Sequence, residues 1–400
     1  MPGRLPPPEW LARAGDRSGY WQLIRSVPLV DAAELAGRIP LHQWRPPAEA
    51  DLEVLEMLRD IDPRRAARLV ERLAEAATVR VPEELTIHNG DYADFAHGRV
   101  ALLVATIEPD MSEVVRTLDL ESGRQTTLAE GKAALTSIAC LGAGQAIGAR
   151  RRDGPLTGFE LVRLDGPRTR VLASGTAVGG ASLAVTASGF VAGLRLAPAA
   201  LVATSADDLR QTDLAQWGLA GGDLLAVHPA GDRLVISDRH RLVTVDQGLE
   251  RALGVAAVPE DFGDVRDMVF CGPDRLLTSG DGGGLLVWDL HGHQPYVTAA
   301  PRGPALRNLF AVPAWGAVGG TDHREHRLRF HDPHTLRPVP PPVPLRAVAE
   351  HLDFVLSSAD GRYVAYGGQL GLAAGHRPRT VGRHTLVHDF DHPGAVLQPP

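Results

Sequence analysis

The chain has 400 residues, of which 44% are hydrophobic and 22% charged, so it can bury a sizeable core and does not have the composition of a disordered protein. Its formal net charge of -7 at pH 7 predicts neither nucleic acid nor an anionic membrane as a partner, and any basic site must be local. Lys132 is the only lysine among 41 basic residues, a usage that indicates a high-GC, actinobacterial genome.

The first 80 residues are predicted to form a helical N-terminal segment. Between residues 48 and 77 the apolar side chains recur at helical spacing, which favours two amphipathic helices. These apolar positions are Leu52, Leu55, Leu58, Ile61, Ala66, Leu69, Val70 and Leu73. Asp62 is a good N-cap and Pro63 is favoured at the first helical position, so one helix ends and the next begins there.

After residue 85 the sequence changes to short runs of Val, Leu, Ala and Phe broken by Gly, Asp and Pro, which is typical of many short strands. One unit of this pattern recurs. Its clearest copy, Val265–Leu290, reads as a strand, a turn, a second strand, a Gly-rich turn and a third strand that ends in Trp288-Asp289. The same frame recurs at residues 224–246 and 352–389. This unit resembles a blade of the WD40 family.

An aspartate that closes the third strand marks each copy. The markers are Asp119, Asp165, Asp207, Asp246, Asp289, Asp332 and Asp389. Successive markers are 46, 42, 39, 43, 43 and 57 residues apart, close to the roughly 40–45 residues of a four-stranded propeller blade, and an inserted loop accounts for the longest step. Each aspartate is expected to accept hydrogen bonds from backbone amides two residues on, at the start of a tight turn.

These spacings predict an all-β fold, in which residues 81–400 form a seven-bladed WD40-like β-propeller behind the short α-helical segment 1–80. Six or eight blades are the alternatives. Because a propeller closes its ring by pairing strands from the two ends of the chain, Thr78–Pro82 and Gly394–Gln398 are both candidates for the outer strand of the last blade.

In a propeller, the turns between second and third strands share one face with the connections between blades. From the turn before the second strand to the closing aspartate, the chain runs 21, 21 and 18 residues in the first three copies, 15, 15 and 16 in the next three, and 28 in the last. We expect the longest loops, in blades seven, one and two, to be neighbours in the closed ring and to form a binding surface.

This predicted surface is rich in basic side chains. They are Arg150, Arg151 and Arg152 in blade two and His376, Arg377, Arg379 and Arg383 in blade seven. Because guanidinium groups bind carboxylates and phosphates through paired hydrogen bonds, these residues favour a protein partner with an acidic surface. The alternative is that they pair with acidic residues of blade one, namely Glu108, Asp110 and Glu113.

No metal or cofactor is predicted. His323 and His326 precede a third strand and His331 and His334 follow it, and because a five-residue strand spans about 16 Å, one ion cannot bind both pairs. No Gly-x-Ser-x-Gly nucleophile motif occurs. The glycine-rich stretch 142–148 is not followed by the helix that a dinucleotide-binding fingerprint requires.

The two cysteines, Cys140 and Cys271, are too few for a disulfide-stapled secreted fold and lack the paired spacing of a zinc site. Each ends a predicted first strand, where a buried free thiol is expected. Residues 1–10 contain prolines where a signal peptide needs an apolar run, and the most apolar stretch, 181–206, is interrupted by an arginine and a proline. These features predict a cytoplasmic protein without a membrane segment.

The resemblance to WD40 propellers implies a protein–protein interaction module or scaffold, which would present a propeller face, the N-terminal helices or both. The alternative is a propeller enzyme of the lyase, hydrolase or cyclase type, with a site at the central funnel formed by loops of several blades. The first acids and bases to test would then be His240, Asp322, His323 and His376.

Overall fold

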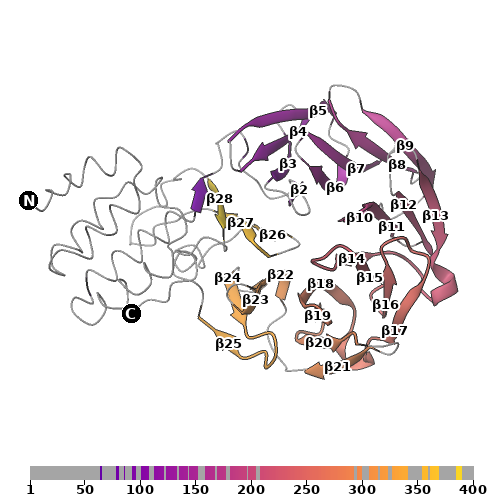
Figure 1. Cartoon of the computed structure of the whole chain (residues 1–400), viewed down its shortest axis with the longest axis vertical. Coiled ribbons are helices and arrows are strands. Elements are labelled where there is room, and N and C mark those ends of the chain that lie inside the picture. The colour runs from indigo at the N-terminus through magenta and orange to yellow at the C-terminus, as the bar shows by residue number, and fades with distance from the viewer. Residues whose placement is uncertain are drawn as a thin grey trace, which may run out of the picture. The chain divides into compact units, whose positions relative to one another are not determined.

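A computed structural model of the chain describes its strands and most of the turns between them (Figure 1). The described residues are 64, 78–80, 85, 92–95, 101–107, 112–120, 123–132, 135–142, 144–151, 158–166, 169–176, 181–195, 197–203, 208–291, 295–299, 306–313, 316–322, 327–340, 354–358, 361–368 and 384–389. Within the predicted helical segment 1–80, Arg64 is helical and Thr78–Arg80 form strand β1. The rest of that segment lies outside the described residues.

The chain divides into two compact units. One contains Met1–Val79, Pro341–Ala347 and His388–Pro400, and the other contains Arg80–Pro340 and Val348–Val387. Nearly all described residues belong to the second unit, and the fold described below is that of this unit together with the strand residues that complete its last sheet.

The described strands form seven four-stranded sheets, numbered here in chain order. Sheet 1 contains β2 (Tyr92–Phe95), β3 (Ala101–Ile107), β4 (Ser112–Asp119) and β5 (Gln125–Lys132); sheet 2 contains β6 (Leu135–Gly142), β7 (Gln145–Arg151), β8 (Gly158–Leu164) and β9 (Arg170–Thr176). Sheet 3 contains β10 (Ala181–Thr186), β11 (Gly189–Leu194), β12 (Ala199–Ala203) and β13 (Leu209–Asp213); sheet 4 contains β14 (Leu224–Val227), β15 (Arg233–Ser237), β16 (Arg241–Asp246) and β17 (Ala252–Ala257). Sheet 5 contains β18 (Val265–Gly272), β19 (Arg275–Gly280), β20 (Leu285–Asp289) and β21 (Tyr296–Ala299); sheet 6 contains β22 (Leu306–Val312), β23 (Ala317–Asp322), β24 (Arg327–His331) and β25 (Pro338–Val339). Sheet 7 contains β26 (Phe354–Ser357), β27 (Tyr363–Gly368), β28 (His384–Asp389) and β1 (Thr78–Arg80). The 3-10 helices η3 (Leu214–Trp217) and η4 (Glu260–Phe262) lie in the connections after sheets 3 and 4.

The sheets are arranged in a closed ring. In sheets 1 to 6 the strands follow one another in sequence order, so each sheet is an up-and-down meander. The first strands of consecutive sheets contact each other from β2 through β6, β10, β14, β18 and β22 to β26, and β26 contacts β2 (Figure 1). A ring of radially placed four-stranded meanders is a β-propeller. The expectation of an all-β propeller is therefore confirmed.

The ring is completed by a strand from the N-terminal side of sheet 1. Sheet 7 has the order β1-β28-β27-β26, so its outermost strand precedes all the others in the sequence. Of the two predicted closing segments, Thr78–Pro82 contains this strand, which spans Thr78–Arg80. The other segment, Gly394–Gln398, lies outside the described residues.

The marker aspartates stand where third strands end. Four are the last residues of β4, β16, β20 and β28, two directly follow β8 and β24, and Asp207 lies outside the described residues. Asp289 Oδ1 accepts a hydrogen bond from the amide of His291 (2.8 Å), and Asp332 Oδ1 accepts one from the amide of His334 (2.8 Å). The predicted turn-capping role is confirmed at these two positions. Hydrogen bonds from the amides of Thr335 and His334 hold the pKa of Asp332 below its ordinary value.

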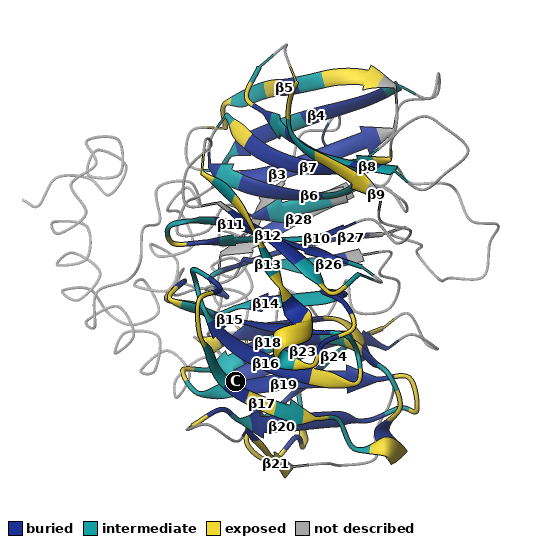
Figure 2. Ribbon diagram, turned by 90° about the vertical axis from the view of Figure 1, so that its right-hand side faces the viewer, coloured by how far each residue is buried: buried dark blue, intermediate teal, exposed yellow. Residues whose placement is uncertain are grey.

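The core lies between neighbouring sheets and contains buried apolar side chains of their second and third strands. Figure 2 colours much of these strands as buried. Phe190 of sheet 3 packs with Phe159 of sheet 2, and Trp288 of sheet 5 packs with Val235 of sheet 4. Outermost strands such as β13 are more exposed. The indole of Trp288 is fully buried, and its Nε1 donates to Thr278 Oγ1 (3.0 Å), which joins the third strand of sheet 5 to the second.

Two glycines allow sheets 3 and 4 to approach closely. Gly193 in β11 and Gly222 before β14 lie backbone to backbone, and a Cβ added to Gly222 would lie 2.6 Å from Gly193 Cα. Because the obstructing atoms are backbone on both sides, neither position has room for a side chain.

Arginines at equivalent places join successive sheets. Arg233, the first residue of β15, donates to the Pro273 carbonyl and to Asp274 Oδ1 (2.7 Å) in the next sheet. Arg275, the first residue of β19, contacts the ring of His334 in sheet 6.

Candidate functional site

One face of the ring carries both the turns between second and third strands and the connections between sheets, because each sheet has four strands that run in alternating directions. On this face, sheets 3, 4 and 5 enclose a pocket of about 460 Å³, here called the connection-face pocket. It is lined by Arg195 after β11, by Ala220, Gly221 and Asp223 before β14, by Asp238, Arg239 and His240 between β15 and β16, and by Asp264 before β18.

The Asp238 carboxylate binds the backbone of two segments that line this pocket. Its Oδ1 accepts hydrogen bonds from the amides of His240 (3.1 Å) and Arg241 (2.8 Å), and its Oδ2 accepts one from the amide of Ala220 (2.8 Å). One carboxylate thus fixes the turn from β15 to β16 and ties it to the connection that enters sheet 4. Arg239 follows in the left-handed region, with a φ of 81°, and its amide donates to Ser237 Oγ (2.9 Å).

A polar chain runs across the pocket from sheet 3 to sheet 4. Arg195 Nε donates to Ser182 Oγ (3.2 Å), and the Ser182 hydroxyl donates to the carbonyl of Asp223 (2.5 Å). The Asp223 side chain is only 7% exposed, and its Oδ2 lies 3.2 Å from Arg239 Nε. A carboxylate removed from water in this way needs a cation beside it, so Arg239 is held against Asp223.

Asp264, which precedes sheet 5, lines the pocket beside His240 of sheet 4. His240 Nδ1 lies 3.7 Å from Asp264 Oδ1, and Arg266 Nη2 lies 4.0 Å from Asp264 Oδ2. Arg266 also donates through Nε and Nη2 to both oxygens of Asp281. These hydrogen bonds lower the pKa of Asp281.

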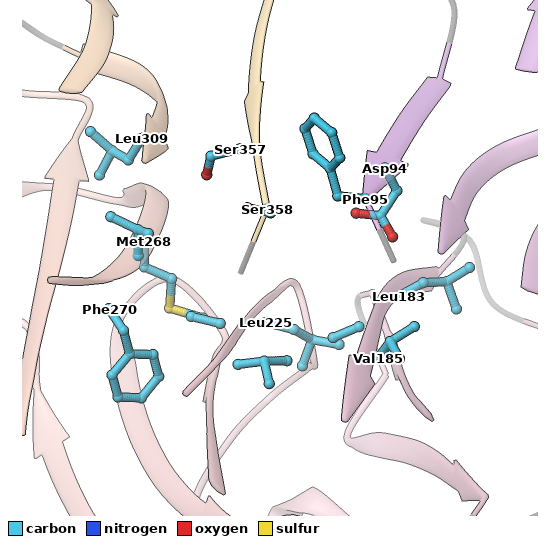
Figure 3. A pocket seen from close by; sticks show the side chains of 14 residues that line it. Asp94, Phe95, Leu183, Val185, Leu225, Met268, Phe270, Leu309, Ser357 and Ser358 are labelled. Carbon is cyan, nitrogen blue, oxygen red and sulfur yellow. The ribbon is translucent and has the colours of Figure 1, made fainter. Parts of the chain in front are cut away.

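A second, smaller cavity of about 190 Å³ lies where the innermost strands meet (Figure 3). Most of its lining residues are of apolar type, among them Leu183, Leu225, Met268 and Phe270, and Asp94 is its charged member. Asp94 Oδ2 accepts from the amide of Cys140 in sheet 2 (2.7 Å), so its carboxyl joins two sheets. Burial raises the pKa of Asp94 to about 7.

Asp267 makes the equivalent link from sheet 5 to sheet 6. Its Oδ2 accepts from the amide of Leu309 (2.6 Å) and its Oδ1 from the amide of Met268 (2.8 Å). Burial raises the pKa of Asp267 to about 6. Both carboxyls are bound to backbone of the ring itself, so we assign them a structural role.

The predicted basic surface is described only in part. Arg150 lies opposite Glu160 on β8 and pairs with it, with its Nε 2.8 Å from Glu160 Oε2. Arg151, the last residue of β7, is exposed. The remaining predicted residues, Arg152, His376, Arg377, Arg379 and Arg383, lie outside the described residues. Glu113, one of the predicted acidic partners, is buried, and its Oε2 accepts from the amide of Leu135 (3.2 Å).

The strand boundaries correct one part of the predicted loop surface, namely the length of the loop in the first sheet. Residues 369–383 separate β27 from β28, and residues 152–157 separate β7 from β8. By contrast, β3 and β4 are separated by residues 108–111 alone, as many residues as lie between β11 and β12 or between β19 and β20. The long span in the first copy comes from its strands, because β3 and β4 run through Ala101–Ile107 and Ser112–Asp119.

Of the predicted acids and bases, the structure places His240 in the connection-face pocket. Asp322 ends β23, is buried, and lies with its Oδ2 3.7 Å from Arg329 Nε. His323 and His376 lie outside the described residues. His331 is buried with its Nδ1 3.0 Å from the Leu336 carbonyl. The described residues contain no cluster of three potential metal ligands.

Sequence reasoning missed Arg195, Asp223 and Asp264 as site residues. The sequence contains one indication of Arg195, which interrupts the most apolar stretch of the chain. Asp223 and Asp264 precede first strands in ordinary connections, and only the packing of sheets 3, 4 and 5 brings all three together.

No protein-family model and no curated protein sequence matches this chain. Solved structures do match it. A chain of the mitotic checkpoint complex is 13% identical over 78% of this chain and 93% of its own length, with a TM-score of 0.52. The structure of U3-55K is 13% identical over 78% of this chain and 98% of its own, with a TM-score of 0.51. The β-propeller domain of Cps50 (Swd1) from Myceliophteria thermophila covers 60% of this chain and 81% of its own at 13% identity, with a TM-score of 0.46.

The chain has a WD40-like β-propeller fold. At such low identity the likeness extends to the fold and carries no site or partner from one propeller to another. Among the described residues of this propeller, no helix has the length and apolar character needed to cross a membrane.

Proposed function

We propose that this chain is a seven-bladed propeller that acts as a scaffold for protein–protein interaction and binds its partner through the connection face. The seven described sheets and the contact between β26 and β2 support the blade count. The connection-face pocket carries the functional proposal, because three sheets hold its charged side chains in fixed positions before any partner binds. Preorganised groups on a rigid ring lose little entropy on association.

The partner is proposed to have an acidic surface. Arg195 and Arg239 contribute guanidinium groups to the pocket, and Arg266 and Arg307 are exposed on the first strands of sheets 5 and 6. We also propose that Arg151, Arg152 and the 369–383 connection, with His376, Arg377, Arg379 and Arg383, extend the basic surface. A cytoplasmic location, an actinobacterial origin and a docking role for residues 1–80 are predictions from the sequence.

The test is affinity purification of tagged full-length chain from its native host, with Arg195→Gln as the matched variant. A protein that is recovered with the wild-type chain, and that binds it again from purified components with fixed stoichiometry, supports the scaffold function. If no purified candidate binds the wild-type chain, the scaffold proposal is wrong. Loss of binding in Arg195→Gln would place the contact on the connection face, and unchanged binding would place it elsewhere.

A catalytic role is the second candidate, because the described pair His240 and Asp264 lies beside an open pocket, and a histidine next to a carboxylate is a common proton-transfer arrangement. The test is hydrolysis of a panel of chromogenic esters, phosphomonoesters and glycosides by the wild-type chain and by His240→Gln. Turnover that is lost in His240→Gln supports catalysis, and equal rates in the two proteins contradict it.

A further inference from the structure

We infer that the connection-face pocket binds a carboxylate of an acidic peptide segment between the guanidinium groups of Arg195 and Arg239. This inference rests on the proposed scaffold function and names the chemical group that the partner supplies. It follows from a comparison of hydrogen-bond acceptors and donors in the pocket.

Each carboxylate that lines the pocket has a basic or backbone amide group as a neighbour. Asp238 accepts from three backbone amides, through both of its carboxylate oxygens. Asp223 faces Arg239 through Oδ2 and is nearly inaccessible to solvent. Asp264 lies near two basic side chains, with its Oδ1 3.7 Å from His240 Nδ1 and its Oδ2 4.0 Å from Arg266 Nη2. A cationic ligand would therefore find no carboxylate that lacks a basic or amide neighbour.

The donors of the pocket are in surplus. An arginine carries five N–H donors in a fixed plane. Arg195 uses Nε for Ser182 Oγ, and Arg239 forms an ion pair with Asp223, whose Oδ2 lies 3.2 Å from the arginine Nε. Within the described part of the chain, the Nη groups of these two residues make no hydrogen bond. The complementary ligand must bring acceptor oxygens.

A carboxylate matches this donor set because its two oxygens lie in one plane with the spacing of the guanidinium fork. The pocket volume of about 460 Å³ admits a glutamate side chain together with its solvent. Arg195 is fixed through Ser182 and Arg239 through Asp223, so both guanidinium groups are positioned from sheets 3 and 4 before the ligand arrives. A phosphate presents similar oxygens, and the experiment distinguishes the two.

The experiment measures fluorescence anisotropy of a labelled hexaglutamate peptide titrated with the full-length chain at low salt. A hexaglutamine peptide of the same length and a phosphoserine peptide are titrated in parallel. We expect hexaglutamate to bind with a saturable curve, hexaglutamine not to bind, and Arg195→Gln to weaken hexaglutamate binding by about tenfold, as expected for loss of a charge-assisted hydrogen bond. If hexaglutamate binds no better than hexaglutamine, or if the phosphoserine peptide binds more than tenfold tighter, the carboxylate assignment is overturned.

Two further variants separate the pocket from general charge effects. Asp223→Asn with Arg239→Gly removes the ion pair as a unit, and glycine suits the φ of 81° at position 239, so the fold should persist, as checked by circular dichroism. This double variant is expected to lose hexaglutamate binding. Arg210→Gln removes an arginine that donates to Glu250 on the outer edge of sheets 3 and 4, and it should bind like the wild-type chain. An equal loss in Arg210→Gln would overturn the assignment to this pocket.

The same variants distinguish this inference from the scaffold proposal. If a purified partner binds the wild-type chain and Arg195→Gln equally well, the carboxylate site is wrong while the scaffold stands. If hexaglutamate binds through Arg195 but no purified protein binds the chain, the scaffold is wrong while the anion site stands.

Discussion

Asp267 and Asp94 show how single carboxyls set the acid–base behaviour of the ring. Each accepts a hydrogen bond from the amide of the next sheet, and burial raises its pKa above the ordinary value of 3.8, to about 6 for Asp267 and about 7 for Asp94. A carboxyl with a raised pKa binds its proton more tightly in the folded protein. Its contribution to stability is therefore full below about pH 4 and is lost as the pH rises through the folded pKa.

Substitution of Asp267 by asparagine tests this behaviour. Asn is neutral at every pH, so the difference in free energy of unfolding between the wild-type chain and Asp267→Asn should shift against the wild type by on the order of 2 kcal/mol between pH 4 and pH 7.5. The measurement is urea unfolding followed by tryptophan fluorescence. Asp261→Asn, at an exposed position in η4, is the control. A difference that does not change with pH would contradict the assignment.

At Gly222, any added side chain would clash with the backbone of Gly193. Because an added Cβ would lie 2.6 Å from the backbone of Gly193, Gly222→Ala must separate sheets 3 and 4 locally. We expect a loss of about 1–3 kcal/mol in the free energy of unfolding, as for other overpacked sites. Gly131→Ala on β5 meets no atom within 4 Å and serves as the control. Equal stability of the two variants would show that the contact can relax.

Within sheet 5, the hydrogen bond from Trp288 to Thr278 joins two neighbouring strands in the core. Thr278→Val leaves a buried indole N–H without its acceptor and should cost about 1–3 kcal/mol. Trp288→Phe removes the donor and part of the packing. Because the second change relieves the unsatisfied group left by the first, the double variant should be less destabilised than the sum of the single variants. Strict additivity in thermal unfolding would contradict a hydrogen bond there.

Between elements, Arg233 at the start of β15 joins sheet 4 to sheet 5 through Asp274. The hydrogen bond from Arg233 lowers the pKa of Asp274. Arg233→Gln should return that pKa toward its ordinary value and cost on the order of 1 kcal/mol, since Asp274 is partly exposed and solvent screens the pair. Carboxyl chemical shifts followed through a pH titration measure the first effect, and an unchanged Asp274 midpoint would contradict the link.

The elements themselves could be predicted from the sequence because their signals are local. The aspartates that cap the turns, such as Asp289 and Asp332, depend on amides two residues away, and their spacing therefore reports the repeat directly. The turn between β3 and β4 was overestimated because a span of sequence does not distinguish a long loop from two long strands. The pocket residues had no such local signal, since Arg195, Asp223 and Asp264 come from different sheets.

Closure of the ring depends on β1, which completes the last sheet. It pairs with β28 as the outer strand of sheet 7. Val79→Pro in the full-length chain removes a backbone donor and should disrupt this strand, which leaves the edge of β28 uncovered. We expect a lower midpoint of thermal unfolding and faster hydrogen exchange in β26–β28. Unchanged exchange in β28 would contradict a closing role for β1.

The order of strands in sheet 7 also determines when each strand can pair with its neighbour during synthesis. Thr78–Arg80 are synthesised long before their neighbour β28, because every other strand of the propeller lies between them in the sequence. Until β28 has been synthesised, β1 lacks its pairing strand, although β26 is already present to contact β2. Translation that stops before His384 would therefore leave β1 and β27 without the strand that lies between them, and the exposed strand edges would be prone to pair with other chains.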